Sequence, residues 1–343
     1  MKKIIIISFL EIWILAPFNQ GLKAQNSQFS QYYAAPLHLN SAFTGATYYA
    51  RANMNFRTQW PSGNSRLNSY LASYDRYFHE YKTGVGGFVN HFDARDGLFS
   101  LTQINASGAY ALDLGQGHSL RFGLQPGLSF KSSMIGNYLF GDQISGNLPN
   151  SIDPTAQQNV ERKTYFEVSS GALLTEKNFW VGITAKNFNR PNISLTQVSS
   201  RLAVYYSLHG GYKFMFVDRR GLVTQNEKSL TLTGNLRHQG ISTQLDLGLY
   251  THLDPLVLGF WYRGFPIKSN SVGLINNDAI VALVGIKIEG LQMGYSFDYT
   301  ISKLAGRWGN AHELSLIFEF GERMVKKKSF KKLPTMYMPY PKI

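Results

Sequence analysis

The residues with catalytic or metal-binding potential are scattered along the chain. Its eight histidines form no pair at a metal-binding spacing, and no G-x-S-x-G nucleophile turn occurs. The chain has no cysteine, which excludes thiolate catalysis, cysteine metal sites and disulfides. We therefore predict a protein that is not an enzyme and that needs no cofactor or metal. The histidines are His38, His79, His91, His118, His209, His238, His252 and His312.

Two short motifs come closest to a chemical site. Residues 91–96, HFDARD, are acidic enough for a calcium loop but lack the required ligand series, so a polar extracellular turn is the favoured interpretation. His312 precedes Glu313 in the manner of a catalytic pair, yet adjacent residues of a strand face opposite sides. Neither motif predicts catalysis.

Strands with one apolar and one polar face organise the chain instead. In residues 241–250, ISTQLDLGLY, Leu245, Leu247 and Leu249 point one way, while Asp246 points the other. In a soluble sandwich such apolar faces would meet another sheet. Here the pattern recurs from about residue 47 to residue 320, with no helical stretch between for the faces to pack against. We therefore predict an all-β, transmembrane antiparallel β-barrel whose apolar faces meet lipid.

Fourteen strand candidates can be counted, and single-chain outer-membrane barrels have an even number. Mean hydropathy is only −0.18, and the longest internal apolar run, 279–286, is far shorter than the ~20 residues of a spanning helix. A helical membrane protein is thus excluded. The candidates are 48–60, 66–78, 82–93, 98–114, 117–132, 162–175, 178–190, 200–216, 228–237, 241–252, 255–264, 271–288, 290–302 and 311–320.

The N-terminus indicates export. Lys2 and Lys3 precede an apolar run over 4–18, and a short exit segment over 22–24 ends at Ala24. This pattern predicts a signal peptide over residues 1–24, cleaved after Ala24. Export combined with lipid-facing strands predicts an outer-membrane location, where the barrel contacts outer-membrane lipids and no nucleic acid.

The barrel is expected to occupy residues 47–320, with a non-strand segment on each side. Residues 25–46 alternate poorly and are placed at the periplasmic mouth. If both termini are periplasmic, the connection over 136–161 follows an odd-numbered strand and is extracellular. Residues 321–343 form a basic, proline-containing periplasmic tail.

The tail suggests two interpretations. A basic tail is often a solvated end, but this one could also be a docking peptide that meets an acidic surface or lipid phosphates. In the second interpretation the aromatic residues, with Met338, fill apolar pockets. The predicted docking residues are Lys326, Lys327, Lys328, Lys331, Lys332, Tyr337 and Tyr340.

Charged residues on the polar strand faces must point into the lumen, because Arg or Lys facing lipid at mid-membrane costs about 2–4 kcal/mol. A barrel of this size is intermediate between filled and open. The lumen residues either line a pore or form a charged lattice that fills it, and we favour the filled lumen. They are Arg57, Arg121, Asp246, Trp261, Arg263 and Asp298.

Several motifs follow one another in order along the chain. The N-terminal motif comprises Gln28, Phe29, Ser30, Gln31, Tyr32, Tyr33, Pro36, Asn40 and Gly45. Further pieces lie at 57–61, 294–299 and 312–316. This ordered set resembles the PorP/SprF family of type IX secretion membrane proteins over roughly residues 28–320. Ser41 departs from the family, which usually has proline there.

The resemblance implies a component of type IX secretion and gliding. It implies binding to periplasmic or lipoprotein components of the machinery, and help in exporting or retaining a secreted surface adhesin. The alternative function is a passive porin or a hydrophobic-solute channel, which would require a continuous wet lumen or a ligand cleft.

Overall fold

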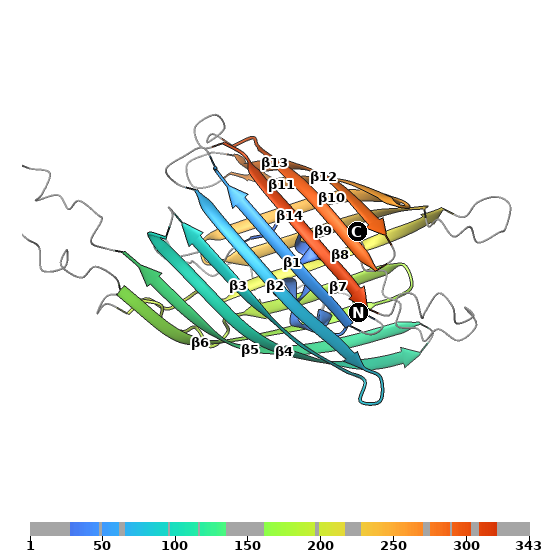
Figure 1. Ribbon diagram of the computed structural model, residues 1–343, viewed down its shortest axis with the longest axis horizontal. Helices are drawn as coiled ribbons and strands as arrows, with labels where there is room; N and C mark the ends of the chain where they lie inside the picture. The colour runs from blue at the N-terminus through green and yellow to red at the C-terminus, as the bar shows by residue number, and fades with distance from the viewer. Residues whose placement is uncertain are drawn as a thin grey trace, which may run out of the picture.

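Fourteen antiparallel strands form a closed barrel in the computed structural model, each strand hydrogen-bonded to its sequence neighbours (Figure 1). The strands are β1 (Ala50–Gln59), β2 (Leu67–Phe78), β3 (Thr83–Ala94), β4 (Phe99–Gly115), β5 (His118–Ser133), β6 (Glu161–Thr175), β7 (Phe179–Lys186), β8 (Tyr205–Phe216), β9 (Lys228–Gln239), β10 (Ser242–Leu253), β11 (Leu256–Ser269), β12 (Ile275–Ile288), β13 (Leu291–Thr300) and β14 (Ala311–Phe320). The structure describes residues 28–47, 50–61, 66–94, 97–115, 117–134, 161–195, 199–216, 228–269, 275–288, 290–302 and 309–320.

The barrel closes where the first strand meets the last. β1 pairs with β14 from Ala50↔Phe320 to Gln59↔Ala311, so this seam is a complete antiparallel ladder. Closure satisfies backbone groups that an open sheet would expose, as a lipid-facing sheet requires. The predicted fourteen-strand antiparallel barrel is confirmed.

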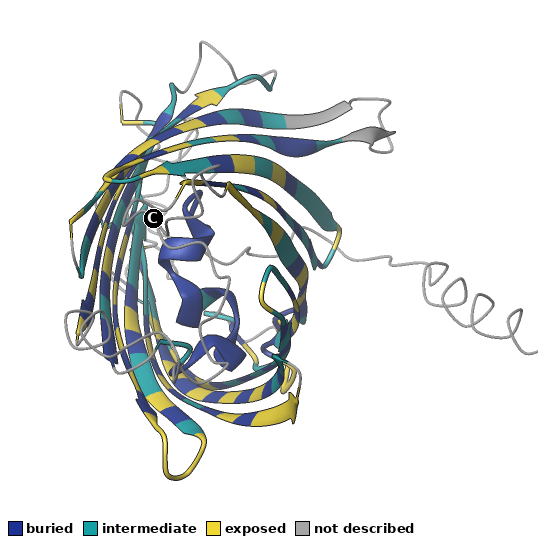
Figure 2. Ribbon diagram, turned by 90° about the vertical axis from the view of Figure 1, so that its right-hand side faces the viewer, coloured by how far each residue is buried: buried dark blue, intermediate teal, exposed yellow. Residues whose placement is uncertain are grey.

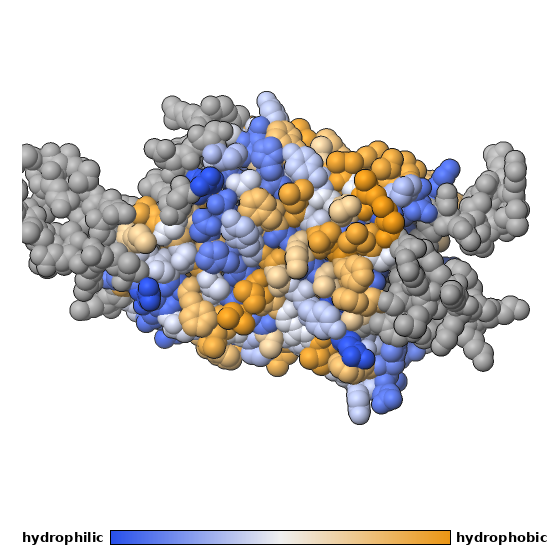
Figure 3. Space-filling view, in the orientation of Figure 1, coloured by the Kyte–Doolittle hydropathy of each residue, from blue (hydrophilic) through white to orange (hydrophobic). Residues whose placement is uncertain are grey.

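The side chains alternate as the sequence predicts. In β10, Leu247 and Leu249 are 50% and 42% exposed, whereas Asp246 between them is 2% exposed. The same alternation of exposed apolar and buried polar residues follows β5 and most of β14, where Ile317 is buried. Burial also alternates along β2, although Leu71 and Tyr77 are buried and Arg76 is exposed. Hydrophobic side chains are accordingly spread over the strand face turned toward the viewer in Figure 3.

Two consecutive strands are shorter than predicted at the ends that face each other along the chain. The candidates over 178–190 and 200–216 become β7, which ends at Lys186, and β8, which begins at Tyr205. Between them Asn187 and Arg190 adopt positive φ angles of 58° and 46°, and Pro191 lacks an N–H group for a ladder. The chain is therefore outside the barrel ladder at the described residues 187–195 and 199–204.

The two ends of the barrel are named here by their connections. The loop end carries the connections that follow odd-numbered strands, including 134–160 and 187–204, and the turn end carries those that follow even-numbered strands. The chain enters β1 and leaves β14 at the turn end. Among the described residues, none of the helices has the length and apolar character needed to cross a membrane.

Three short helical turns fold inside the barrel rather than outside it: η1 (Tyr32–Ala34), α2 (Pro36–Leu39) and η2 (Ser41–Phe43) (Figure 2). We call residues 28–46 the plug. The expected position of this segment at the barrel mouth is wrong, because almost every plug residue is buried and its polar groups bond to the inner wall. The predicted signal peptide and tail lie outside the described residues, as does the 136–161 connection except Glu161.

Candidate functional site: a plugged lumen

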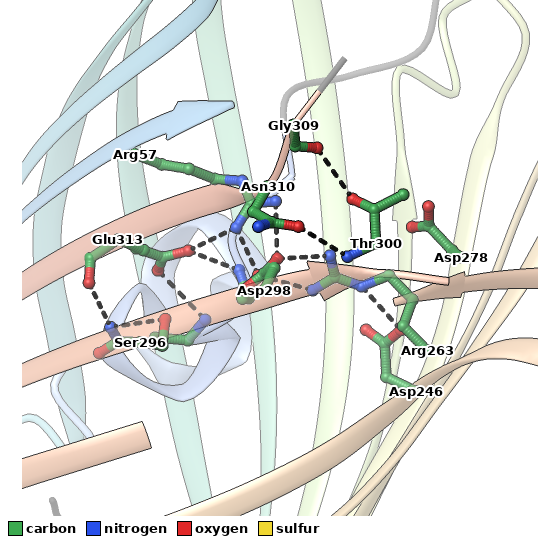
Figure 4. A network of polar contacts seen from close by, with 12 residues as sticks. Arg57, Asp246, Arg263, Asp278, Ser296, Asp298, Thr300, Gly309, Asn310 and Glu313 are labelled. Carbon is green, nitrogen blue, oxygen red and sulfur yellow. Dashed lines mark hydrogen bonds and ion pairs between the residues drawn. The ribbon is translucent and has the colours of Figure 1, made fainter. Parts of the chain in front are cut away.

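A buried ion-pair lattice joins six strands, β1, β9, β10, β11, β13 and β14, across the lumen, and Figure 4 shows its centre. Three arginines face three carboxylates, so the lattice is charge-balanced. The contacts are Arg57 with Asp298 at 2.8 Å and with Glu313 at 3.2 Å, Arg263 with Asp298 at 3.0 Å and with Asp246 at 3.4 Å, and Arg237 with Asp246 at 2.6 Å. Buried charges are tolerated when they are paired and hydrogen-bonded in this way.

Ser30 of the plug binds at the centre of the lattice. Its hydroxyl donates to Asp298 Oδ2 at 2.6 Å and accepts from Arg263 Nη2 at 2.7 Å and from Arg57 Nη1. A hydroxyl offers one donor and two acceptor sites, so the capacity of Ser30 is fully used. Its backbone N–H also donates to Glu313 Oε2 at 2.7 Å.

Gln31 extends these contacts to β13 and β14. Its N–H donates to Glu313 Oε1 at 3.1 Å, and its side-chain amide donates to Ser296 Oγ at 3.1 Å. Its side-chain oxygen, Oε1, accepts from Ser315 Oγ at 2.5 Å. The start of the plug is thus fixed to the half of the lumen near the loop end, two to four residues from the start of β14.

The middle of the plug is held by wall side chains that bind its backbone carbonyls. Arg121 donates to Ala42 O at 3.0 Å and to Thr44 O at 2.5 Å, and Gln125 donates to Leu37 O at 3.2 Å. Lys186 donates to His38 O. These bonds satisfy carbonyls that have no sheet or long helix to pair with.

Asn40 fixes the plug to β6 and β7 by a different pattern. Its side-chain amide donates to Ala172 O at 3.1 Å and to Ile183 O at 3.0 Å, so it inserts between β6 and β7. Its Oδ1 accepts from Ala42 N at 2.8 Å, which caps η2. One side chain therefore both shapes the plug and attaches it.

Two wall glycines allow this close approach. A Cβ added at Gly123 would lie 2.3 Å from Ala42 N and 2.3 Å from Ser41 C, and one added at Gly171 would lie 1.9 Å from Asn40 Oδ1. Both positions face the lumen within strands, where glycine often marks a second backbone approaching closely. The plug and wall are complementary in shape there.

Aromatic packing fills the space between the polar contacts. The Tyr33 ring stacks on Trp261 with centroids 5.8 Å apart and an interplanar angle of 14°, and it also contacts Tyr250. His38 lies between Phe29 and Phe88. Burial, with Lys186 and Arg237 nearby, holds the pKa of His38 well below its usual range, so the ring is neutral among these apolar partners.

The turn end of the plug is closed by a further ion pair. Arg51 Nη2 and Asp75 Oδ2 lie 3.0 Å apart, and Asp75 also accepts from Gly45 N at 2.7 Å. A cavity of about 20 Å³ beside the plug, lined in part by Tyr32, Lys186 and Arg237, is large enough for roughly one water molecule. The plug is thus bonded to the wall near both of its ends, at Ser30 and at Gly45.

The six predicted lumen residues are all buried inside the barrel, but they do not form one group. Arg57, Asp246, Arg263 and Asp298 belong to the lattice. Trp261 packs on Tyr33, and Arg121 binds the plug backbone. The motif residues from Phe29 to Gly45 all lie within the plug, and Gln28 lines its small cavity.

Sequence reasoning missed the wall residues that receive the plug, chiefly Glu313, Gln125, Lys186 and the two glycines. The available signal was glycine on the inward phase of strands, as at Gly123 between Arg121 and Gln125. The predicted tail residues from Lys326 to Tyr340 lie outside the described residues. Within the part of the chain that the structure describes, no group of three or more metal-ligating side chains could hold a metal ion.

Comparisons with solved structures find outer-membrane proteins at low sequence identity. Omp33 of Acinetobacter baumannii has a TM-score of 0.42 and 8% identity, covering 81% of this chain and all of its own (100%). A Pseudomonas aeruginosa FadL homologue has a TM-score of 0.45 and 9% identity, covering 84% of this chain and 94% of its own. The Pseudomonas putida toluene transporter TodX has a TM-score of 0.41 and 11% identity, covering 82% of this chain and 92% of its own. No match is found among curated proteins.

A family model matches residues 21–318, which is most of the chain and includes both the plug and nearly all of the barrel. The match agrees with the resemblance carried by the N-terminal motif. It also agrees with a closed barrel whose outward side chains are apolar. This outer-membrane β-barrel therefore belongs to the type IX secretion system membrane protein PorP/SprF family.

Proposed function

We propose that this protein is a closed, non-enzymatic barrel that holds components of the type IX secretion and gliding apparatus at the outer membrane. In this role it binds periplasmic or lipoprotein components and helps to export or retain a surface adhesin. The supporting observation is the plug: Ser30, Asn40 and the rest of residues 28–46 fold inside the lumen and bond to its wall. Such a barrel is better suited to assembly than to diffusion.

In the proposed orientation the turn end faces the periplasm. β14 ends there at Phe320, so the basic tail over 321–343 would emerge on the periplasmic side. The loop end would then face the cell exterior, where the secreted partner is held. Support comes from the lengths of the connections, since outer-membrane barrels have short periplasmic turns and longer outer loops.

The conductance of the purified full chain tests the closed lumen. In planar lipid bilayers we expect no stepwise ion conductance, because the plug folds inside the lumen and hydrogen-bonds to its wall. An open porin in the same bilayer serves as the positive control. Steady open-pore conductance by the full chain would support the alternative function, a passive porin or hydrophobic-solute channel.

The tail supplies a separate prediction. Deleting residues 321–343 removes six of the chain's cationic lysines (Lys326, Lys327, Lys328, Lys331, Lys332 and Lys342) together with Tyr337 and Tyr340. We expect periplasmic partners to be lost from pull-downs of gently solubilised membranes. The barrel should still assemble, because every described strand ends by Phe320.

A variant with the same length and charge provides the control for this deletion. Exchanging Tyr337 and Tyr340 for serine leaves the lysines in place and separates aromatic docking from simple attraction to acidic surfaces. An unchanged set of partners after complete deletion of the tail would show that it is a solvated end and not a docking peptide.

A further inference from the structure

β6 has an unpaired edge at the loop end. It pairs with β5 along its whole length, from Ser133↔Glu161 to Ser119↔Thr175. With β7 it pairs only from Ser170↔Ala185 to Thr175↔Trp180. Within the described ranges, no strand lies against the other edge of residues 161–169, because β7 ends early and the chain turns away from the wall.

The side chain of Asn189 hydrogen-bonds to this edge at Val168 and Phe166, as a neighbouring strand would. Its Oδ1 accepts from Val168 N at 3.2 Å, and its Nδ2 donates to Phe166 O at 2.8 Å. The side-chain amide thus replaces one peptide unit of a neighbouring strand. In an antiparallel strand the N–H and C=O groups of every second residue point to the same edge. The even-numbered residues of β6 therefore point to the edge that Asn189 contacts. Beyond Asn189 this edge presents the N–H groups of Arg162, Thr164 and Phe166 and the carbonyls of Arg162 and Thr164.

Part of the open edge lies at the level of the apolar belt. Phe166, which is 51% exposed, pairs with Leu128, and Thr164 pairs with Phe130. Leu128 and Phe130 are exposed outward-facing residues of β5. Unpaired backbone groups are strongly unfavourable in hydrocarbon, so backbone hydrogen bonds alone would stabilise an added strand here.

The rim of the open edge is basic. Arg162, Arg190 and Arg201 are exposed and Lys163 is partly exposed. Neither carboxylate among the described residues of 161–169 and 187–204 is exposed: Glu161 is half-buried, and Glu167 is buried and bound by Gln103 and Asn105. This charge distribution favours a segment that carries acidic side chains.

A second copy of the chain does not fit this edge. Two copies in one membrane share the same up-down direction, so a two-fold axis would run along the membrane normal. With such an axis, each N–H group of the edge faces the equivalent N–H group of the second copy instead of a carbonyl. The two β6 strands would also cross at twice their tilt, about 70–90°.

We propose that residues 162–166 of β6 accept an extended acidic segment of a partner protein as an additional strand. Backbone hydrogen bonds would supply the affinity and the basic rim the selectivity, as in other cases of strand addition. The inference rests on the proposed function in one respect, since a partner must be presented at the loop end.

The test uses the purified full chain in lipid nanodiscs with a synthetic probe. The probe is a ten-residue peptide of alternating threonine and glutamate that ends in a photoreactive benzoylphenylalanine. One comparison peptide carries lysine in place of glutamate, and another is N-methylated at alternate residues so that it cannot pair. Cross-links are mapped by mass spectrometry.

Two substitutions at one position isolate the backbone. Thr164→Pro removes an N–H that faces the open edge and leaves the β5 ladder intact, whereas Thr164→Val keeps the N–H. We expect the wild type and T164V to cross-link the acidic peptide within 161–168, and T164P to do so at least tenfold less. The basic and N-methylated peptides should bind at least tenfold more weakly to the wild-type protein.

Several results would overturn the proposal: equal labelling of T164P and T164V, equal labelling by acidic and N-methylated peptides, or cross-links outside this edge. Binding that appears only after removal of 136–160 would mean that the chain covers its own edge. The N-methylated peptide tests wild-type protein, so it is informative even if T164P does not fold. Adhesin retention by T164P cells is scored separately: retained adhesin with lost peptide binding would contradict the docking site but not the proposed function.

Discussion

Replacing Gly123 with valine is expected to convert the closed barrel into a conducting one. The new Cβ would lie 2.3 Å from Ala42 N and 2.3 Å from Ser41 C, whereas favourable contacts between carbon atoms lie at about 3.5–4.0 Å. Both obstacles are backbone atoms, so no rotamer change can relieve the clash. The plug must retreat by more than ~1 Å, which breaks the nearby Arg121 bonds to Ala42 and Thr44.

Single-channel recording measures this effect. We expect Gly123→Val to show conductance steps that the wild type lacks, with an amplitude approaching that of a barrel from which 28–46 has been deleted. Gly108→Val is the matched control, because a Cβ there would meet only Gly84 O at 3.9 Å. A silent G123V barrel that folds normally would show that the plug tolerates the displacement or is not the barrier.

The strands could be predicted because their signal is local. Alternation over ten residues places Asp246 inward and Leu247 outward, and the cost of a charge facing lipid then fixes the phase of Arg57, Arg263 and Asp298. The fold class, the strand number and the burial of these side chains follow from that one rule. Closure follows too, because an open edge of this size cannot face lipid.

The plug could not be predicted in the same way, because its contacts are remote in sequence. Ser30 binds Glu313 and Asp298, which lie 283 and 268 residues away. The plug sequence shows no hydrophobic periodicity typical of a strand or a helix, because its three helical turns are only three or four residues long. The inward-facing glycines indicate that something approaches the wall closely, but they do not identify which segment does so.

The early end of β7 was missed for a different reason. Residues 187–190 retain enough apolar character to continue an alternating pattern, yet the positive φ angles of Asn187 and Arg190 end the ladder. Pro191 was the visible signal. Because the ladder ends there, the basic edge of β6 has no neighbouring strand among the described residues.

Replacing Asp298 with asparagine is expected to produce the largest loss of stability among single substitutions in the lattice. Oδ2 of Asp298 accepts from Ser30 Oγ at 2.6 Å and lies 2.8 Å from Arg57 Nη2 and 3.0 Å from Arg263 Nη1. The amide preserves the shape but leaves one buried positive charge unbalanced. Removing one partner of a buried ion pair costs about 3–5 kcal/mol.

The loss is measured as the free energy of unfolding, from urea titrations of the protein in lipid vesicles. Glu80→Gln, at an exposed turn, is the control and should stay within ~0.5 kcal/mol of the wild type.

The double variant D298N/R263Q provides the decisive comparison, because it leaves Arg57 and Arg237 opposite Asp246 and Glu313 and so restores neutrality. If charge imbalance dominates, the double variant will be no less stable than D298N alone, and the coupling energy will reach about 1–3 kcal/mol. Additive losses would mean instead that the individual hydrogen bonds, including those to Ser30, carry the stability, and that the plug is held by geometry rather than by the charge balance of the lattice.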